Sequence, residues 1–231
     1  MSGKMQIDHI FAVKSAEELA NYQAFVQRIE EKLYRYITVL QEKYAVEEWP
    51  STIVWTSRET ATKLLSDIPV PSYTNERRIV FCPELRVWRE IYLAQLKGLT
   101  GETADKIRKY YETRLTENHV LQILGHEFVH HSEYFSDEDY EIDPWYEEGM
   151  AEYISRKELL SEAEFEEKAE IERLLVDLLS PRFSKGNLAP GSGEDYAGIF
   201  FSYWRGFLAA QKRVAVYGGN VVDALKRGRK K

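Results

Sequence analysis

Residues 125–130 of the chain read Gly-His-Glu-Phe-Val-His, which places two histidines four positions apart. Residues i and i+4 lie on the same face of an α-helix, so His126 and His130 can bind one metal ion between them. Glu127 then lies beside that ion. The apolar residues that would bury such a helix are Val120, Ile123, Leu124, Phe128 and Val129. The pattern predicts a buried helix, over about residues 103–133, that carries a metal site.

A second segment, residues 145–153, reads Trp-Tyr-Glu-Glu-Gly-Met-Ala-Glu-Tyr and follows an Asp-Pro step that is typical of a helix start. A catalytic zinc ion has three protein ligands and one open position for water, so two histidines leave the site one ligand short. Glu148, 18 positions after His130, can supply the missing ligand. Glu133 and Glu147 remain alternatives for this position.

The two segments together resemble the gluzincin metallopeptidases, in which an HExxH helix is followed by a second helix whose Glu-Gly step provides the third zinc ligand. The resemblance covers residues 126–153 closely and residues 196–226 loosely. It implies that His126, His130 and Glu148 bind one Zn²⁺ ion per chain. Two imidazoles, a carboxylate and an open position also suit zinc on chemical grounds.

The same resemblance assigns a role to Glu152, one turn after Glu148. It corresponds to the acid that accepts a hydrogen bond from a ligand histidine and fixes the orientation of its ring. The metzincins are excluded because they need a glycine and a third histidine shortly after HExxH, where this chain has Glu133 and Ser136.

The chemistry follows from these ligands. Zinc lowers the pKa of a bound water molecule toward about 7. Glu127 is placed to take the proton of this water and to pass it to the leaving amine. The reaction expected is therefore peptide hydrolysis. The run Tyr-Trp-Arg-Gly-Phe-Leu at residues 203–208 resembles the tyrosine helix of the aminopeptidase-like branch. Tyr203 is therefore the first candidate donor to the oxyanion, and Tyr196 the second. An endopeptidase is favoured, since no GxMEN-like segment precedes the HExxH helix.

Composition sets the class of protein. With 231 residues, 44% of them hydrophobic, the chain can bury a good core. Its net charge of -7 argues against nucleic-acid binding, and the partner expected is a peptide or protein substrate. No signal sequence and no apolar run of about 18 residues is found, so no membrane association is expected. A single cysteine, Cys82, suits a reducing cytoplasm.

The order of predicted elements indicates a mainly helical α+β fold of the zincin type, with the zinc cleft between two lobes of one catalytic domain. The N-terminal lobe, residues 1–133, contains a long helix capped by Ser15, strands at residues 52–56 and 77–82, and the HExxH helix. The C-terminal lobe, residues 134–231, is helical and carries the third ligand.

Two further expectations concern surfaces. By resemblance, Ile79, Val80 and Phe81 form an edge strand that binds the extended backbone of a substrate. The helix that starts after Ser161 is expected to end before Pro181 and to turn its charged face to solvent. That face consists of Glu166, Glu167, Lys168, Glu170, Glu172 and Arg173.

Two other functions remain open from the sequence. One is a catalytically silent zinc-binding protein with a regulatory or interaction role. The other is a regulator protease that cuts a single protein partner. The presence of Glu127 favours an enzyme, because a zinc scaffold has no need for a general base.

Overall fold

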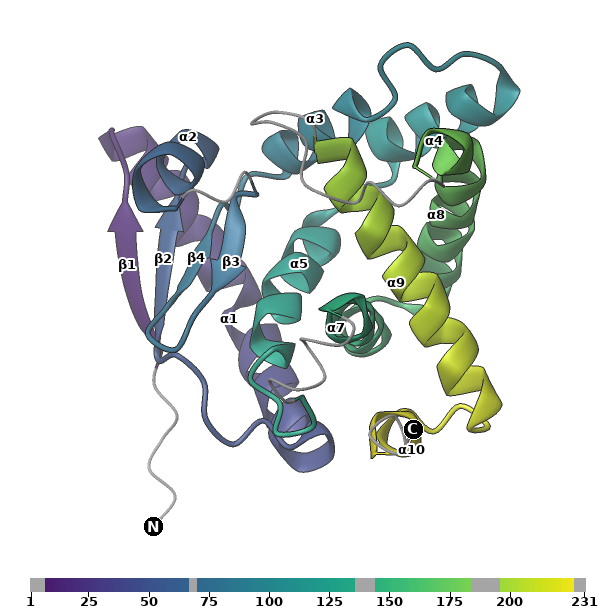
Figure 1. Ribbon diagram of the computed structural model, residues 1–231. Helices are drawn as coiled ribbons and strands as arrows, with labels where there is room; N and C mark the ends of the chain where they lie inside the picture. Colours follow the sequence, from purple (N-terminus) through teal and green to yellow (C-terminus); the bar gives the residue numbers. More distant parts are fainter. Residues whose placement is uncertain (1–6, 67–69, 136–143, 184–195, 227–231) are drawn as a thin grey trace.

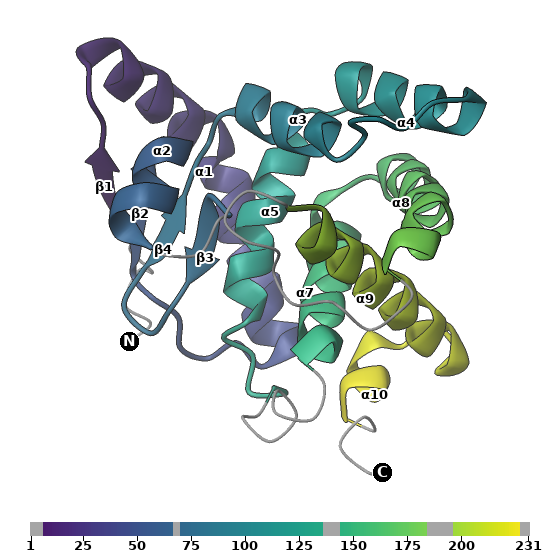
Figure 2. The ribbon, with the colours of Figure 1, turned by 45° about the horizontal axis from the view of Figure 1, so that its top comes forward.

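The computed structural model describes residues 7–66, 70–135, 144–183 and 196–226 (Figure 1). A small sheet lies on one side of the molecule, two helices run through the centre, and further helices cover the opposite side (Figure 2). The mainly helical fold with a small mixed sheet agrees with the α+β class expected from the sequence. One hydrophobic cluster contains residues from Ile7 through Leu225 and so joins both predicted lobes.

The sheet has the strand order β1-β2-β4-β3, formed by β1 (Asp8–Ala12), β2 (Thr52–Thr56), β4 (Ile79–Phe81) and β3 (Ser72–Thr74). The first three strands are parallel, whereas β3 runs antiparallel to β4. Branched and aromatic residues favour these strands. Neither β1 nor β3 was expected from the sequence, and β3 directly follows a proline-rich turn.

The prediction that Ile79–Phe81 form an edge strand is wrong. Ile79, Val80 and Phe81 pair with β2 on one side and β3 on the other, and their side chains are fully buried. A strand that is paired on both sides has no free backbone groups to bind a peptide. The edge next to the central helices is instead β3.

Helix α1 (Ala16–Tyr44) lies behind the sheet and the central helices in Figure 1. Ser15 caps it as predicted, because the Ser15 side chain accepts a hydrogen bond of 3.1 Å from the amide of Glu18. The helix ends at Ala45 in the left-handed conformation, with φ 51°. The hydroxyl of Tyr36 donates a hydrogen bond of 3.0 Å to the carbonyl of Gly125 and ties α1 to the HExxH segment.

The single helix expected over residues 103–133 is divided into α4 (Glu102–Thr113) and α5 (Glu117–Val129). The break has a local cause: the amide of Thr116 donates to Nδ1 of His119 at 3.2 Å, which starts a new helix at that point. Before α4, the chain forms α2 (Arg58–Thr60), the π-helical turn η1 (Ala61–Leu65) and α3 (Leu85–Ala94).

The C-terminal part consists of α7 (Pro144–Leu159), α8 (Glu162–Phe183), α9 (Tyr196–Val216) and α10 (Val221–Lys226). Pro181 lies inside α8, which continues to Phe183, so the expected end of this helix before Pro181 is wrong. In the described part of the chain no helix is both long and apolar enough to cross a bilayer.

Helices α7 and α9 approach very closely at two glycines, and α9 runs diagonally beside α7 in Figure 1. A Cβ atom on Gly149 would lie 2.3 Å from the carbonyl oxygen of Gly206, so only glycine fits there. This contact fixes Glu148, next to the first glycine, relative to Tyr203, which precedes the second by one turn.

Candidate metal centre

Helices α5 and α7 lie side by side and bring the three predicted ligands together (Figure 2). His126 lies in the last turn of α5, His130 caps its end, and Glu148 extends from the first turns of α7. Nε2 of His126 lies 2.9 Å from Nε2 of His130 and 3.1 Å from Oε2 of Glu148. Nε2 of His130 is 3.5 Å from the same carboxylate oxygen.

These separations fit a tetrahedral zinc ion. With bonds of about 2.0–2.1 Å, such an ion holds its ligand atoms about 3.3 Å apart. The observed distances of 2.9, 3.1 and 3.5 Å bracket that value. Two imidazole nitrogens and one carboxylate oxygen are also the donor types that zinc prefers. The residues present therefore match the requirements of a zinc ion with three protein ligands.

The sequence left Glu147 as an alternative third ligand, and the structure places it elsewhere. Its Oε1 lies 2.6 Å from Nδ1 of His130, the ring nitrogen that faces away from the ligand cluster. Burial lowers the pKa of His130, but the carboxylates of Glu148 and Glu147 outweigh it, so the pKa is raised well above its ordinary value. Glu147 thus orients His130, a role that its sequence position alone did not reveal.

Glu152, which the resemblance makes the acceptor of a hydrogen bond from a ligand histidine, lies beside the other histidine, His126. Its Oε1 is 3.4 Å from the buried Nδ1 of His126, a contact whose geometry falls outside that of a hydrogen bond. Burial raises the pKa of Glu152, but the positive charges of Arg156 and His126 are stronger and lower it to about 2. A carboxylate therefore faces the outer nitrogen of each histidine.

Behind Glu152 lies a buried group of charged and polar side chains. Arg156 contacts Glu152 at 2.5 Å and forms two hydrogen bonds, of 2.5 and 2.9 Å, with Glu172 of α8. Lys168, also of α8, donates a hydrogen bond of 2.6 Å to Gln122, whose amide nitrogen is 3.3 Å from Glu152. Two cations and two carboxylates thus balance each other next to the candidate metal centre.

The prediction that the charged face of α8 is exposed to solvent is wrong for two of its residues. Lys168 is 2% exposed and Glu172 1% exposed. Desolvation by burial lowers the pKa of Lys168 to about 8. A helical pattern shows which residues share a face, but the partners that make burial of a charge tolerable come here from α5 and α7.

The expected general base, Glu127, is buried and points toward the sheet. The hydroxyl of Ser72 on β3 donates a hydrogen bond of 2.6 Å to its Oε1. Burial raises the pKa of Glu127, although the charges of His126 and His130 and the bond from Ser72 act in the opposite direction. The sequence contained no signal for Ser72, since it lies in a stretch that reads as a turn.

Tyr203 also lies at the centre. Its ring is 5.8 Å from the ring of His126 and 6.0 Å from that of Trp145. Burial and the nearby carboxylates, Glu148 first among them, raise its pKa well above the ordinary value, so its hydroxyl keeps its proton. The side chain of Tyr196, the second candidate, lies outside the described residues.

A small cavity of about 40 Å³ opens beside His126 and Glu127. Its walls include the aromatic rings of Tyr92, Phe200 and Trp204. His131 contacts Thr74 of β3 at 2.7 Å through Nε2. Two contacts therefore hold the edge strand in place, one from Glu127 of α5 to Ser72 and one from His131, just past the end of α5, to Thr74.

Some sequence features fall outside the described residues, namely the acidic run at residues 137–143, residues 184–195 and most of the basic C-terminal tail. Comparison of the chain with protein-family models, with curated proteins and with solved structures finds no match.

Proposed function

We propose that the chain is a zinc-dependent metallopeptidase of the gluzincin type. The observation that carries this proposal is the convergence of His126, His130 and Glu148 at tetrahedral spacing. Glu127 lies next to His126 on α5. It completes the set of groups that hydrolysis of an amide requires.

A zinc ion held by these residues would supply an activated water molecule and polarise a substrate carbonyl. The chain's own residues handle the proton. Glu127 is held at Oε1 by Ser72, which leaves Oε2 to accept a proton and later to release it to the leaving amine. Tyr203, kept protonated by its surroundings, donates a hydrogen bond to the oxyanion.

The position of β3 supports a peptide as the substrate. It is an antiparallel edge strand, and it contacts Glu127 of α5 through Ser72 and His131, which follows α5, through Thr74. A free edge adds an extended peptide through backbone hydrogen bonds. In this proposal β3 takes the role that the sequence gave to Ile79–Phe81, and the cleft lies between the lobes at residues 1–133 and 134–231, as in zincins.

An endopeptidase of the cytoplasm is the form of the enzyme that we favour. The only cysteine, Cys82, is buried, and burial raises the pKa of its thiol to about 12, so it has no role in the chemistry. The reaction rests on nitrogen and oxygen groups alone.

The proposal is tested by metal content and by turnover. Elemental analysis should find about one zinc per wild-type chain and a strong loss in Glu148→Ala. Glu166→Ala, an exposed glutamate of α8, is the matched control and should keep the metal. No zinc in the wild type after reconstitution would refute the metal site.

Turnover separates the enzyme from the silent zinc protein. Glu127→Gln should keep the zinc and lose hydrolysis of an unfolded protein substrate, because only the general base is removed. A wild-type protein that binds zinc but cleaves nothing would instead support the regulatory alternative.

A further inference from the structure

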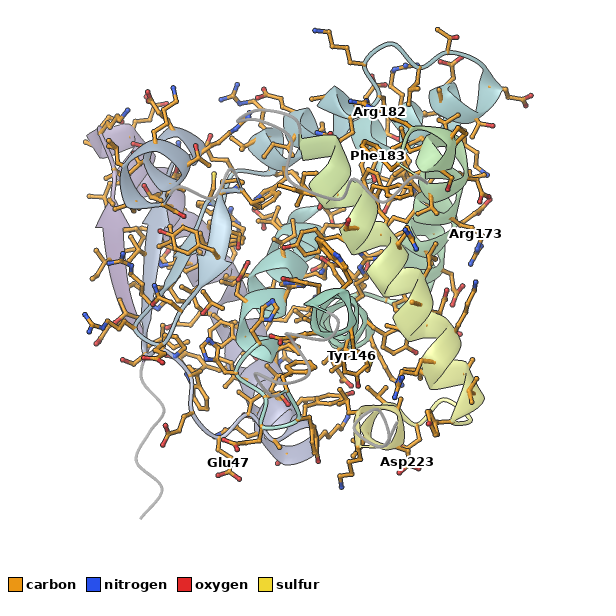
Figure 3. The ribbon with its side chains drawn as sticks, in the orientation of Figure 1. Glu47, Tyr146, Arg173, Arg182, Phe183 and Asp223 are labelled. Atoms are coloured by element: carbon orange, nitrogen blue, oxygen red, sulfur yellow. The ribbon has the colours of Figure 1, made fainter. Side chains whose placement is uncertain are left out.

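A second, larger cavity of about 300 Å³ lies between α7 and α9. Trp145 and Tyr146 of α7 and Arg205 and Arg213 of α9 line it, and a glycine and two alanines of α9 leave the space open. Tyr146, labelled in Figure 3, lies between α7 and α10, and its hydroxyl is 3.5 Å from the carbonyl of Leu225. None of the three predicted metal ligands lines this cavity.

The two arginines give the cavity its chemistry. No carboxylate in the described part of the chain lies within ion-pair distance of either guanidinium group. Arg213 uses only Nε, which donates 2.9 Å to the carbonyl of Ala224, and its guanidinium lies 5.0 Å from the ring centre of Tyr146. Arg205 lies 5.7 Å from the ring centre of Phe201. The terminal nitrogens of both groups are therefore left to bind a ligand.

The cavity adjoins the metal centre through aromatic contacts. The ring of Trp145, which lines it, is 6.0 Å from that of Tyr203, which in turn is 5.8 Å from His126. Trp145 also precedes the ligand Glu148 by less than one helical turn.

We propose that this cavity binds a carboxylate of a peptide, either an acidic side chain or the C-terminal group. The planar guanidinium binds a carboxylate through two parallel hydrogen bonds and can at the same time stack on an aromatic ring. A volume of about 300 Å³ holds a side chain or a chain end. The net charge of -7 disfavours a long polyanion such as a nucleic acid.

The binding site itself does not depend on the metal. That the bound peptide is the substrate rests on the proposed function. The two ideas can therefore fail separately, and the experiment measures binding without turnover.

Isothermal titration of the full chain carrying Glu127→Gln would use three N-acetylated octapeptides. The first has two glutamates and an amidated C-terminus, the second is neutral with a free C-terminus, and the third is neutral and amidated. The first or the second should bind at least about tenfold more tightly than the third, and whichever does so identifies the source of the carboxylate. Equal affinity for all three would overturn the proposal.

Substitutions locate the site. Arg205→Gln should weaken binding of the preferred peptide about tenfold, while Lys212→Gln, which removes one charge from an exposed neighbour on the same helix, should not. Ala209→Phe fills the cavity without changing charge and should also weaken binding. Because both test positions are exposed, the variants should fold normally, which circular dichroism checks. Equal loss in the lysine variant, or none in the other two, would contradict the assignment.

Zinc content and hydrolysis are measured on the same preparations. If a chain without zinc binds acidic peptides, the carboxylate-binding site is supported and the proposed zinc peptidase is refuted. If the chain hydrolyses peptides but shows no preference for carboxylates, the peptidase is supported and the carboxylate-binding site is refuted.

Discussion

The hydroxyl of Ser72 donates a buried hydrogen bond of 2.6 Å to Oε1 of Glu127, from a residue 55 positions earlier in the chain. This bond joins the edge strand β3 to helix α5. It fixes one oxygen of the expected general base, Oε1, on the side of the sheet. The orientation of the base is therefore set by the sheet.

Ser72→Ala should lower kcat/KM for peptide hydrolysis about ten- to hundredfold, the range expected for a hydrogen bond to a buried carboxylate. Zinc content should not change, because Ser72 contacts none of the three ligands. Ser72→Thr, which keeps the hydroxyl, should restore part of the activity. Wild-type kinetics in the alanine variant would show that Glu127 needs no such positioning.

Glu172→Gln should lower the free energy of unfolding by about 3–5 kcal/mol, because it leaves the buried Arg156 with one carboxylate fewer. It should also weaken zinc binding about tenfold or more, since Arg156 holds Glu152 against His126. Denaturant unfolding and a competitive zinc titration measure the two effects.

Glu170→Gln is the matched control for that experiment, because Glu170 lies on the same helix in an exposed pair with Lys106. It should change neither quantity measurably. If Glu172→Gln unfolds the protein, the double variant Arg156→Leu/Glu172→Leu removes both charges and should fold, yet still bind zinc more weakly. Full affinity in a folded double variant would disprove the link to α8.

Gly149→Ala should destabilise the protein by about 1–3 kcal/mol or more, because its Cβ would meet backbone atoms of Gly206 and force α7 away from α9. Gly198→Ala on α9 is the control. The nearest atom there is 3.7 Å away, and alanine favours a helix, so stability should stay equal or rise by up to about 1 kcal/mol. Thermal unfolding compares them, and similar melting temperatures would contradict the close approach.

We expect the fold to lose stability at acid pH because of His119. Burial lowers its pKa to about 3 from 6.5, so between these pH values the unfolded chain binds a proton that the folded chain excludes. Its contribution to stability is full above pH 6.5 and falls toward pH 3, by up to about 1.4 kcal/mol per pH unit. His119→Gln keeps an acceptor for the amide of Thr116. Urea unfolding between pH 4 and 8 should show that the slope of the unfolding free energy against pH falls by the amount that corresponds to one proton. An unchanged slope would place the titration elsewhere.

The sequence by itself determined what depends on local spacing. Two histidines or two glutamates four positions apart share a helix face, and helix caps such as Ser15 act within a few residues, so α1, the ligand pairs and the start of α8 were predictable. The mixed helical and strand character followed from periodicity in the same way.

Only the tertiary structure decided which strand is the edge, which charges are buried and what orients each candidate metal ligand. Periodicity gives the same pattern for a strand paired on one side or on both, so β4 was taken for the edge that β3 provides. Lys168 and Glu172 read as solvated because their partners, Gln122 and Arg156, come from other helices. Burial of a charge depends on such distant partners, and local sequence does not encode them.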